Sequence, residues 1–229
     1  MKQRRNHAPN PSLEVSTAAW AAAGAGTTLS RENEGIDGGW CARLSHAGAG
    51  AAGYLRTAVV NSIPAAPGDV FTVSCYVKGD TTALVGVGVR WLNASNGVIS
   101  ADTANVGAPS ASYQRISRVL APAPDLTVKL QVQFSTNAGF GDGDTIDLDR
   151  FLVEQVDALG GYFDGATRDP ATPKWVPSWE GAEHLSPSLL TYDTVLSSGV
   201  RQMHVADRLP TQTDGEVGDM WFYVQGATS

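Results

Sequence analysis

The side chains that could do chemistry in this chain are sparse, and their spacing matches no catalytic or metal-binding motif. None of the four histidines has metal-ligand spacing to another histidine or to a cysteine. Neither a nucleophile elbow nor a phosphate-binding loop is present. Asp147 and Asp149 would share one face of a strand at about 7 Å, a separation that could serve a glycosidase. Their place on the last predicted strand explains them better, so we expect no enzymatic activity.

The candidate binding residues are polar side chains on predicted strands. Strands predicted over residues 70–78, 83–92 and 127–134 alternate apolar with polar side chains, so their polar members would point away from the core. The polar members that could bind a ligand are Tyr76, Arg90, Gln131 and Gln133. If these strands are neighbours in one sheet, they would form a shallow groove with amide and guanidinium donors, an aromatic ring and two glycines that leave room. Such a groove suits a sugar; an ordinary solvated sheet face is the alternative.

Strand signals recur along residues 10–157, with turn residues between them. Roughly eight or nine strands fit into this stretch, and no amphipathic helix is indicated. The pattern predicts an all-β protein whose main domain, residues 10–157, is an antiparallel β-sandwich, with the jelly roll as the favoured form.

Charge and hydropathy exclude two classes of partner. A net charge of −7 with 17% charged residues argues against a duplex nucleic-acid binder, and no apolar run reaches the length of a membrane span. The basic residues Lys2, Arg4 and Arg5 lie in residues 1–9, which we expect to be a flexible, solvated arm. No apolar stretch follows them, so we expect synthesis in the cytoplasm without a secretory signal.

The two cysteines, Cys41 and Cys75, are expected to remain unpaired. Alternation along their strands points Cys41 outward and Cys75 into the core. Side chains that point in opposite directions cannot form a disulfide without backbone movement.

Residues 158–195 contain aromatic side chains among prolines and glycines, without a helical or strand period. The aromatic residues concerned are Tyr162, Phe163, Trp175 and Trp179. An extended segment of this kind has no core of its own, so we expect it to wrap either on its own domain or on a partner subunit. We take these four residues as candidates for an assembly interface.

Residues 196–229 are expected to add a short β-hairpin, with an extended stretch over residues 200–207 and a strand over residues 220–224. Trp221, Phe222 and Tyr223 are consecutive, so both faces of the second strand carry an aromatic ring. Two strands alone are marginal in water, and an apolar edge is an aggregation hazard. We therefore expect docking onto another subunit, with folding back onto the sandwich as the alternative.

Several short motifs resemble a known family. Asn10–Glu14 resembles the opening of carbohydrate-binding-module jelly rolls of the galactose-binding-like type, and Pro67–Lys78, Tyr113–Ser117 and Ile146–Glu154 resemble three of their later strands. The segment Tyr162–Ser188 is similar to the tail that follows such domains in minor tail proteins of actinobacterial siphophages.

Two departures from these motifs concern aromatic residues. Leu13 stands where the opening motif has an aromatic residue, and Tyr113 stands where tryptophan is common.

The stretch from Leu209 to Trp221 resembles modules near the ends of phage tail and fibre proteins.

The resemblance implies a structural minor tail protein of a bacteriophage virion, near the tail tip and in contact with a host-surface glycan. It implies other tail proteins, copies of this chain and a cell-wall glycan as partners, and the virion tail as location. It further implies a structural calcium ion held by Glu14 and Asp149, because calcium prefers oxygen ligands. A free carbohydrate-binding module without catalytic activity is the alternative.

Overall fold

The computed structural model describes residues 3–36, 39–48, 50–167 and 175–192, together with the backbone of residues 203–206 and 220–223. The chain forms two compact units. The larger comprises Arg4–Thr167 and Pro177–Leu190, and the smaller comprises Met1–Gln3, Arg168–Val176 and Thr191–Ser229. No helix in the described part of the chain has the length and apolar character that crossing a membrane requires.

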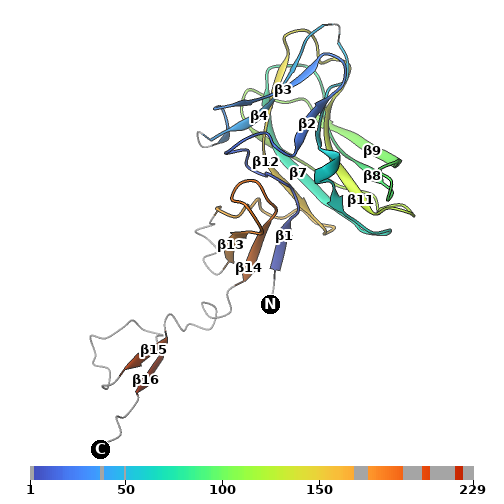
Figure 1. Cartoon of the computed structure of the whole chain (residues 1–229). Helices are drawn as coiled ribbons and strands as arrows, with labels where there is room; N and C mark the ends of the chain where they lie inside the picture. The colour runs from blue at the N-terminus through green and yellow to red at the C-terminus, as the bar shows by residue number, and fades with distance from the viewer. Residues whose placement is uncertain are drawn as a thin grey trace, which may run out of the picture. The chain divides into compact units, whose positions relative to one another are not determined.

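The first of the two main sheets is antiparallel throughout (Figure 1). Its strand order is β2 (Trp20–Ala23), β5 (Tyr54–Thr57), β11 (Lys129–Thr136), β8 (Val85–Leu92) and β9 (Val98–Gly107), with β6 (Ile63–Pro64) also on β11. Because consecutive side chains on a strand alternate between faces, each of these strands buries one set and leaves the other on the far side of the sheet.

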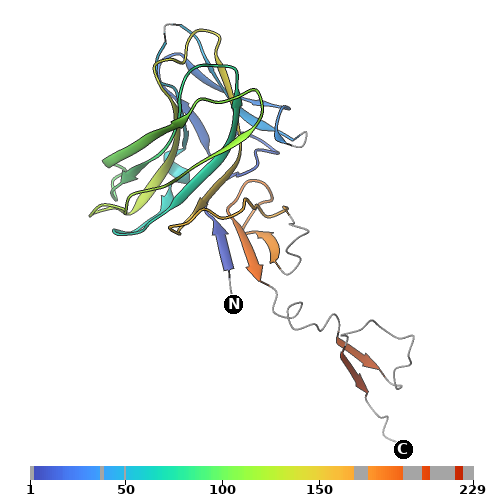
Figure 2. The same ribbon diagram turned by 180° about the vertical axis from the view of Figure 1, so that it is seen from behind.

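The second sheet has five antiparallel strands, and Figure 2 shows the same sandwich from behind. Its order is β10 (Gln114–Val119), β7 (Thr72–Gly79), β12 (Thr145–Glu154), β4 (Cys41–His46) and β3 (Thr27–Glu32). The crossovers between strands that are distant in sequence produce a sandwich, which confirms the predicted all-β jelly-roll class.

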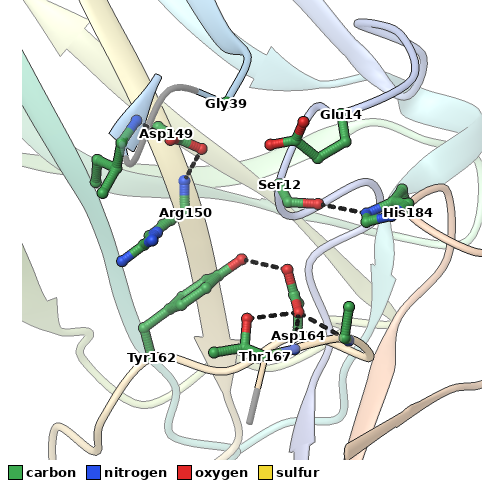
Figure 3. Close-up of a pocket in the computed structure, with 11 residues that line it drawn as sticks. Ser12, Glu14, Gly39, Asp149, Arg150, Tyr162, Asp164, Thr167 and His184 are labelled. Atoms are coloured by element: carbon green, nitrogen blue, oxygen red, sulfur yellow. Dashed lines mark hydrogen bonds between the residues drawn. The ribbon is translucent and has the colours of Figure 1, made fainter. Parts of the chain in front are cut away.

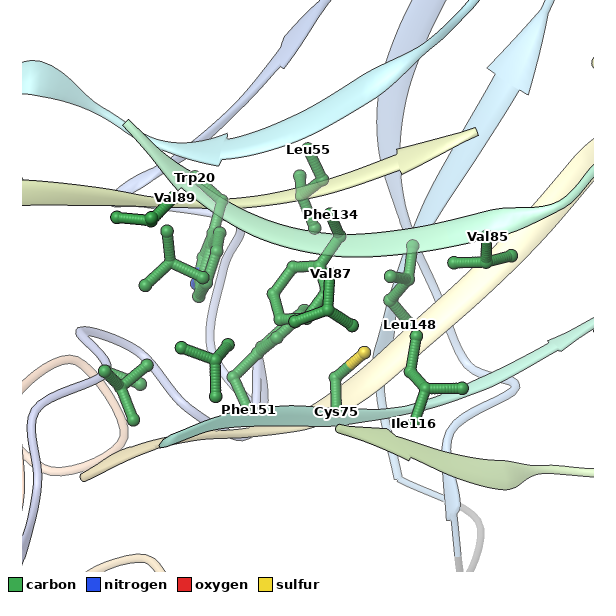
Figure 4. Packing of buried hydrophobic residues seen from close by; sticks show 14 of the residues in the cluster. Trp20, Leu55, Cys75, Val85, Val87, Val89, Ile116, Phe134, Leu148 and Phe151 are labelled. Atoms are coloured by element: carbon green, nitrogen blue, oxygen red, sulfur yellow. The ribbon is translucent and has the colours of Figure 1, made fainter. Parts of the chain in front are cut away.

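The core fills the space between the two sheets (Figure 4). Phe151 on β12 is its aromatic centre: its ring lies 4.2 Å from that of Trp20 and 5.2 Å from that of Phe134, centroid to centroid. Val87 of β8 is fully buried in the same cluster. Large aromatic rings contribute most of the apolar area that stabilises such an interior.

Both cysteines are free, as expected, and both are buried, including Cys41, which alternation places on the outward face. Cys75 lies in the core, where burial raises its thiol pKa well above the ordinary value. Cys41 lies on the opposite face of its sheet from Leu44 and donates its S–H to the Glu32 carbonyl oxygen. Burial also raises the pKa of Cys41, to about 11, which disfavours the thiolate.

The prediction of a flexible basic arm needs correction for residues 3–9. Gln3–Asn6 form strand β1, which belongs to a three-stranded sheet of order β1, β14 (Ser188–Tyr192) and β13 (Trp175–Trp179). The Arg4 guanidinium donates to both oxygens of Glu154 at 2.9 and 2.7 Å, and Arg5 pairs with Glu180 at 2.8 Å. Carboxylates from much later in the chain therefore hold these arginines, and Lys2 lies outside the described residues.

The segment after the sandwich packs on its own unit, which is the first of the two surfaces expected for it. Phe163 is only 2% exposed, and the Arg4 guanidinium lies 4.8 Å from its ring. The Trp179 ring packs so closely on Gly165 that a Cβ there would come within 2.3 Å of it. Phe163 is therefore unavailable to a partner, contrary to its assignment to an assembly interface.

Trp175 belongs to the smaller unit, where its ring lies 5.2 Å from that of Tyr192. The same unit contains β15 (Met203–Ala206) and β16 (Met220–Tyr223). These two strands pair in parallel, so they do not form the expected hairpin. The intervening residues 207–219 are about the dozen that a parallel connection needs. The side chains of Trp221, Phe222 and Tyr223 lie outside the described residues.

Candidate functional site

The polar face of the six-stranded sheet is centred on β11. Gln131 pairs with Arg90 of β8, while Gln133 pairs with Arg56 of β5 on one side and with Gly88 of β8 on the other. The structure thus places three of the four predicted groove residues on one face: Arg90, Gln131 and Gln133. It adds Arg56, which the sequence did not single out.

Both glutamine amides are hydrogen-bonded to neighbouring strands. Gln133 accepts a hydrogen bond from Arg56 Nε at 2.6 Å and donates one to Thr103 Oγ1 at 2.8 Å. Gln131 accepts from Arg90 Nη1 at 3.0 Å and donates to the Thr57 carbonyl oxygen at 2.7 Å. Gln131 and Gln133 are 3% and 4% exposed, so they hold the two guanidinium groups in place and are not themselves free ligand donors.

Tyr54 supplies an aromatic ring to the same face. It lies on β5 two residues before Arg56, whose guanidinium carbon lies 4.3 Å from the centre of the Tyr54 ring. Burial is the main cause of a lowered pKa for Arg56, and the positive charge of Arg90 contributes further. The face therefore carries a stacking surface beside two fixed cationic donors.

The two glycines of this face do not leave open room. A Cβ on Gly88 would lie 2.3 Å from the Asp102 carbonyl oxygen and from Thr103 Oγ1, and one on Gly86 would lie 2.5 Å from Ser135 Oγ. Glycine is needed because β9 and Ser135 approach so closely. The space that alternation seemed to leave for a ligand is already filled.

Tyr76 belongs to the other sheet, so it cannot contribute to this face. It lies on β7, opposite Arg115 of β10 and Asp149 of β12. There it lines a separate recess of about 560 Å³ with Lys78 and Tyr113. The condition that all four predicted residues share one sheet therefore fails for Tyr76.

A second recess, of about 290 Å³, brings together the first loop, the last sandwich strand and the segment after it (Figure 3). Its lining includes Glu14, Asp149, Tyr162 and Asp164. The Tyr162 hydroxyl donates to Asp164 Oδ2 at 3.1 Å, and burial raises the pKa of that hydroxyl well above its usual value. Ser12 and His184 are hydrogen-bonded at 3.1 Å across the same recess.

No protein-family model and no curated protein matches this chain. Solved structures do match its fold, among them the enzymatically active domain of bacteriophage CBA120 tailspike protein 4, at a TM-score of 0.52 and 17% identity. That match covers 66% of this chain and 21% of the tailspike chain. The CBM22-1 xylan-binding domain of Paenibacillus barcinonensis Xyn10C matches at a TM-score of 0.50 and 15% identity, over 65% of this chain and 93% of that domain.

The chain therefore has a jelly-roll fold, which it shares with these structures. At these identities the likeness extends to the fold alone, and this chain spans about a fifth of the length of the tailspike chain. What the fold can bind must therefore be argued from its own residues.

We propose that Glu14 and Asp149, which both line the second recess, would hold the calcium ion that the sequence resemblance implies. Asp149 is 3% exposed, and burial raises the pKa of its carboxyl to about 7, with the charge of Glu14 acting in the same direction. A Cβ on Gly39 would lie 2.5 Å from Glu14 Oε1, so this loop approaches the carboxylate closely. Carboxylate oxygens are hard donors of the kind that calcium prefers.

We expect calcium to raise the melting temperature of the full chain by roughly 5–10 °C at a concentration of 100 times its Kd, because it binds only the folded state. The Asp149→Asn variant should lose this shift. Asp142→Asn, which removes an exposed carboxylate that accepts from the Gly48 amide, should keep it. An unchanged melting curve of the wild type in EDTA and in calcium would exclude the site.

Sequence alternation found Arg90, Gln131 and Gln133 but missed Tyr54, Arg56 and Thr103. The available signal was the alternation of Tyr54 and Arg56 with Leu55, which predicts a strand with these two side chains on one face. The neighbour relation between β5 and β11 joins residues about 80 positions apart, and no local pattern records it.

Proposed function

We propose that this chain is a non-catalytic glycan-binding protein that uses the polar face of its six-stranded sheet. The observation that carries the proposal is a pair of side-chain hydrogen bonds beside the ring of Tyr54. One joins Arg56 to Gln133, and the other joins Arg90 to Gln131. Sugar hydroxyls accept hydrogen bonds from fixed donors, and the apolar face of a sugar ring stacks on an aromatic side chain. The jelly-roll fold supports the same glycan-binding function.

Removal of the aromatic platform should weaken glycan binding more than any change to the other sheet. We expect Tyr54→Ala to reduce affinity at least tenfold for the glycans that the wild-type chain binds on a glycan array, as measured by calorimetric titration. Tyr76→Ala is the matched control, because Tyr76 lies on the five-stranded sheet, and it should leave affinity unchanged. The reverse result would move the binding surface to the other sheet.

We further propose that the protein is a minor tail protein of a bacteriophage, located in the virion near the tail tip, where copies of the chain hold a host cell-wall glycan. The resemblance of Tyr162–Ser188 to tail-protein segments supports this role, and the likeness of fold to a phage tailspike is consistent with it. Several linked weak sites raise overall affinity by orders of magnitude, which suits adhesion.

A free carbohydrate-binding module is the alternative, and size-exclusion chromatography with light scattering separates the two. We expect an oligomer of the full chain, whereas a monodisperse monomer favours the free module. Deletion of residues 196–229 should abolish incorporation into particles while the sandwich still melts cooperatively. Normal incorporation of the truncated chain would contradict the proposed anchoring role of this segment.

A further inference from the structure

The six-stranded sheet has an unusual distribution of charge for an acidic protein. Its strands contain three basic residues, Arg56, Arg90 and Lys129, and a single acidic one, Asp102. The Asp102 carboxylate is already paired with Arg118 of β10, at 2.9 and 2.8 Å. The face is therefore locally cationic although the whole chain carries a net charge of −7.

Arg56 and Arg90 differ from three other arginines of the same unit, Arg4, Arg43 and Arg118. Arg4, Arg43 and Arg118 each bind both oxygens of a carboxylate. Within the described residues, Arg56 and Arg90 form no ion pair, and their side-chain hydrogen bonds go to neutral glutamine amides. A guanidinium that is partly removed from water without an anionic partner is costly to the fold.

Arg56 and Arg90 lie on the two strands that flank β11, opposite Gln133 and Gln131. The charge of Arg90 helps to lower the pKa of Arg56, after burial as the main cause. One glutamine hydrogen bond holds each guanidinium in place, through Nε of Arg56 and through Nη1 of Arg90. Each group therefore keeps further N–H donors in a fixed orientation. Two guanidinium groups that are held in place and have no acidic partner suit an anion bound between them.

We propose that the polar face selects saccharides that bear an oxyanion, held between Arg56 and Arg90, over neutral saccharides. This inference rests on the proposed glycan-binding function and specifies its ligand class. Lys129 follows the alternation of Gln131 and Gln133 and so lies on the same face, where it extends the cationic surface along β11. Carboxylate and sulfate groups on sugars share the required chemistry, because each presents two or more oxygens to a guanidinium fork.

Calorimetric titration of the full chain with three matched probes tests the proposal. The probes are cellotetraose, the same tetrasaccharide with carboxylates at C6, and the same tetrasaccharide with sulfates at C6. In 20 mM NaCl we expect at least one charged probe to bind tenfold or more tightly than the neutral one. That preference should shrink at 200 mM NaCl, because salt screens partly exposed charges. The two charged arms distinguish a carboxylate ligand from a sulfate ligand.

Variants locate the effect on the two arginines. Arg56→Gln and Arg90→Gln should each reduce the preference for the charged probe several-fold, and the double variant should remove it. Arg5→Gln is the matched control, because it makes the same change in net charge at a residue paired with Glu180. Melting curves of every variant show whether the fold is retained, and Arg90→Lys separates the loss of the fork from the loss of charge.

Equal affinity for charged and neutral probes would overturn this inference while leaving the glycan-binding proposal intact. A charged-probe preference that survives in the folded double variant would also overturn it. Failure of the wild-type chain to bind any probe, or any glycan on an array, would overturn both proposals together.

Discussion

Replacement of Asn6 by alanine is expected to lower the free energy of unfolding of the larger unit by about 3–5 kcal/mol. The Asn6 side chain is fully buried and makes four hydrogen bonds. Its Nδ2 donates to the carbonyl oxygens of Phe151 and Phe163 at 2.9 and 3.1 Å. Its Oδ1 accepts from the amides of Ala8 and Val153 at 3.1 and 3.0 Å. Alanine would leave four backbone groups without these partners in the interior.

Thermal unfolding of the full chain measures this effect. The expected loss corresponds to a fall in melting temperature of roughly 10 °C for a unit of this size. Asn61→Ala is the matched control, since Asn61 is exposed in the short 3₁₀ helix Val59–Asn61, and it should change stability by less than about 0.5 kcal/mol. A fall in melting temperature of 2 °C or less for Asn6→Ala would show that the four hydrogen bonds of Asn6 contribute little to stability.

The second large effect is expected at the ion pair between Arg43 and Asp147, which are neighbours on β4 and β12. Arg43 Nε and Nη2 donate to the two Asp147 oxygens at 2.6 and 2.7 Å, and Lys78 Nζ lies 3.6 Å from the same carboxylate. The hydrogen bonds from Arg43 to Asp147 raise the pKa of the guanidinium above its ordinary value. Asp147→Ala leaves two cations without their shared carboxylate and should cost about 3–5 kcal/mol.

Denaturant unfolding of three variants separates the cost of an orphaned charge from the net value of the pair. The double variant Arg43→Met with Asp147→Leu removes both charges and should lie within about 2 kcal/mol of the wild type. Glu180→Ala breaks the more exposed pair with Arg5 and should cost less than about 1 kcal/mol. If Asp147→Ala lowers the free energy of unfolding no more than Glu180→Ala does, the pair between Arg43 and Asp147 stabilises the protein no more than an exposed ion pair.

Local alternation predicts the strands of this fold well where they are buried on one face. The apolar set Val85, Val87 and Val89 is buried as expected, and the strands predicted over residues 70–78, 83–92 and 127–134 correspond to β7, β8 and β11. Alternation does not predict β9, Val98–Gly107, because this strand lies at the edge of its sheet and most of its side chains are exposed. An edge strand needs little apolar surface, so its composition resembles that of a loop.

The candidate binding face shows the limit of the same reasoning. Alternation assigns a side chain to one face of its own strand, but the sheet to which the strand belongs is decided by long-range pairing. Tyr76 and Arg90 have the same kind of strand pattern, and the structure places them in different sheets. Local pattern also does not predict that β1 is an ordered strand, because Asn6 finds its hydrogen-bond partners on residues 151–163.

The contacts of Asn6 have a consequence for how this protein acquires its structure during synthesis. The amide of His7 donates to the Val153 carbonyl oxygen, so residues synthesised before the sandwich strands find their partners on its last strand. Contacts between such distant positions carry a high entropic cost of loop closure and slow the search. Residues 6–8 must therefore stay without these partners until residues 151–163 have been synthesised, so folding of the larger unit cannot finish before that point.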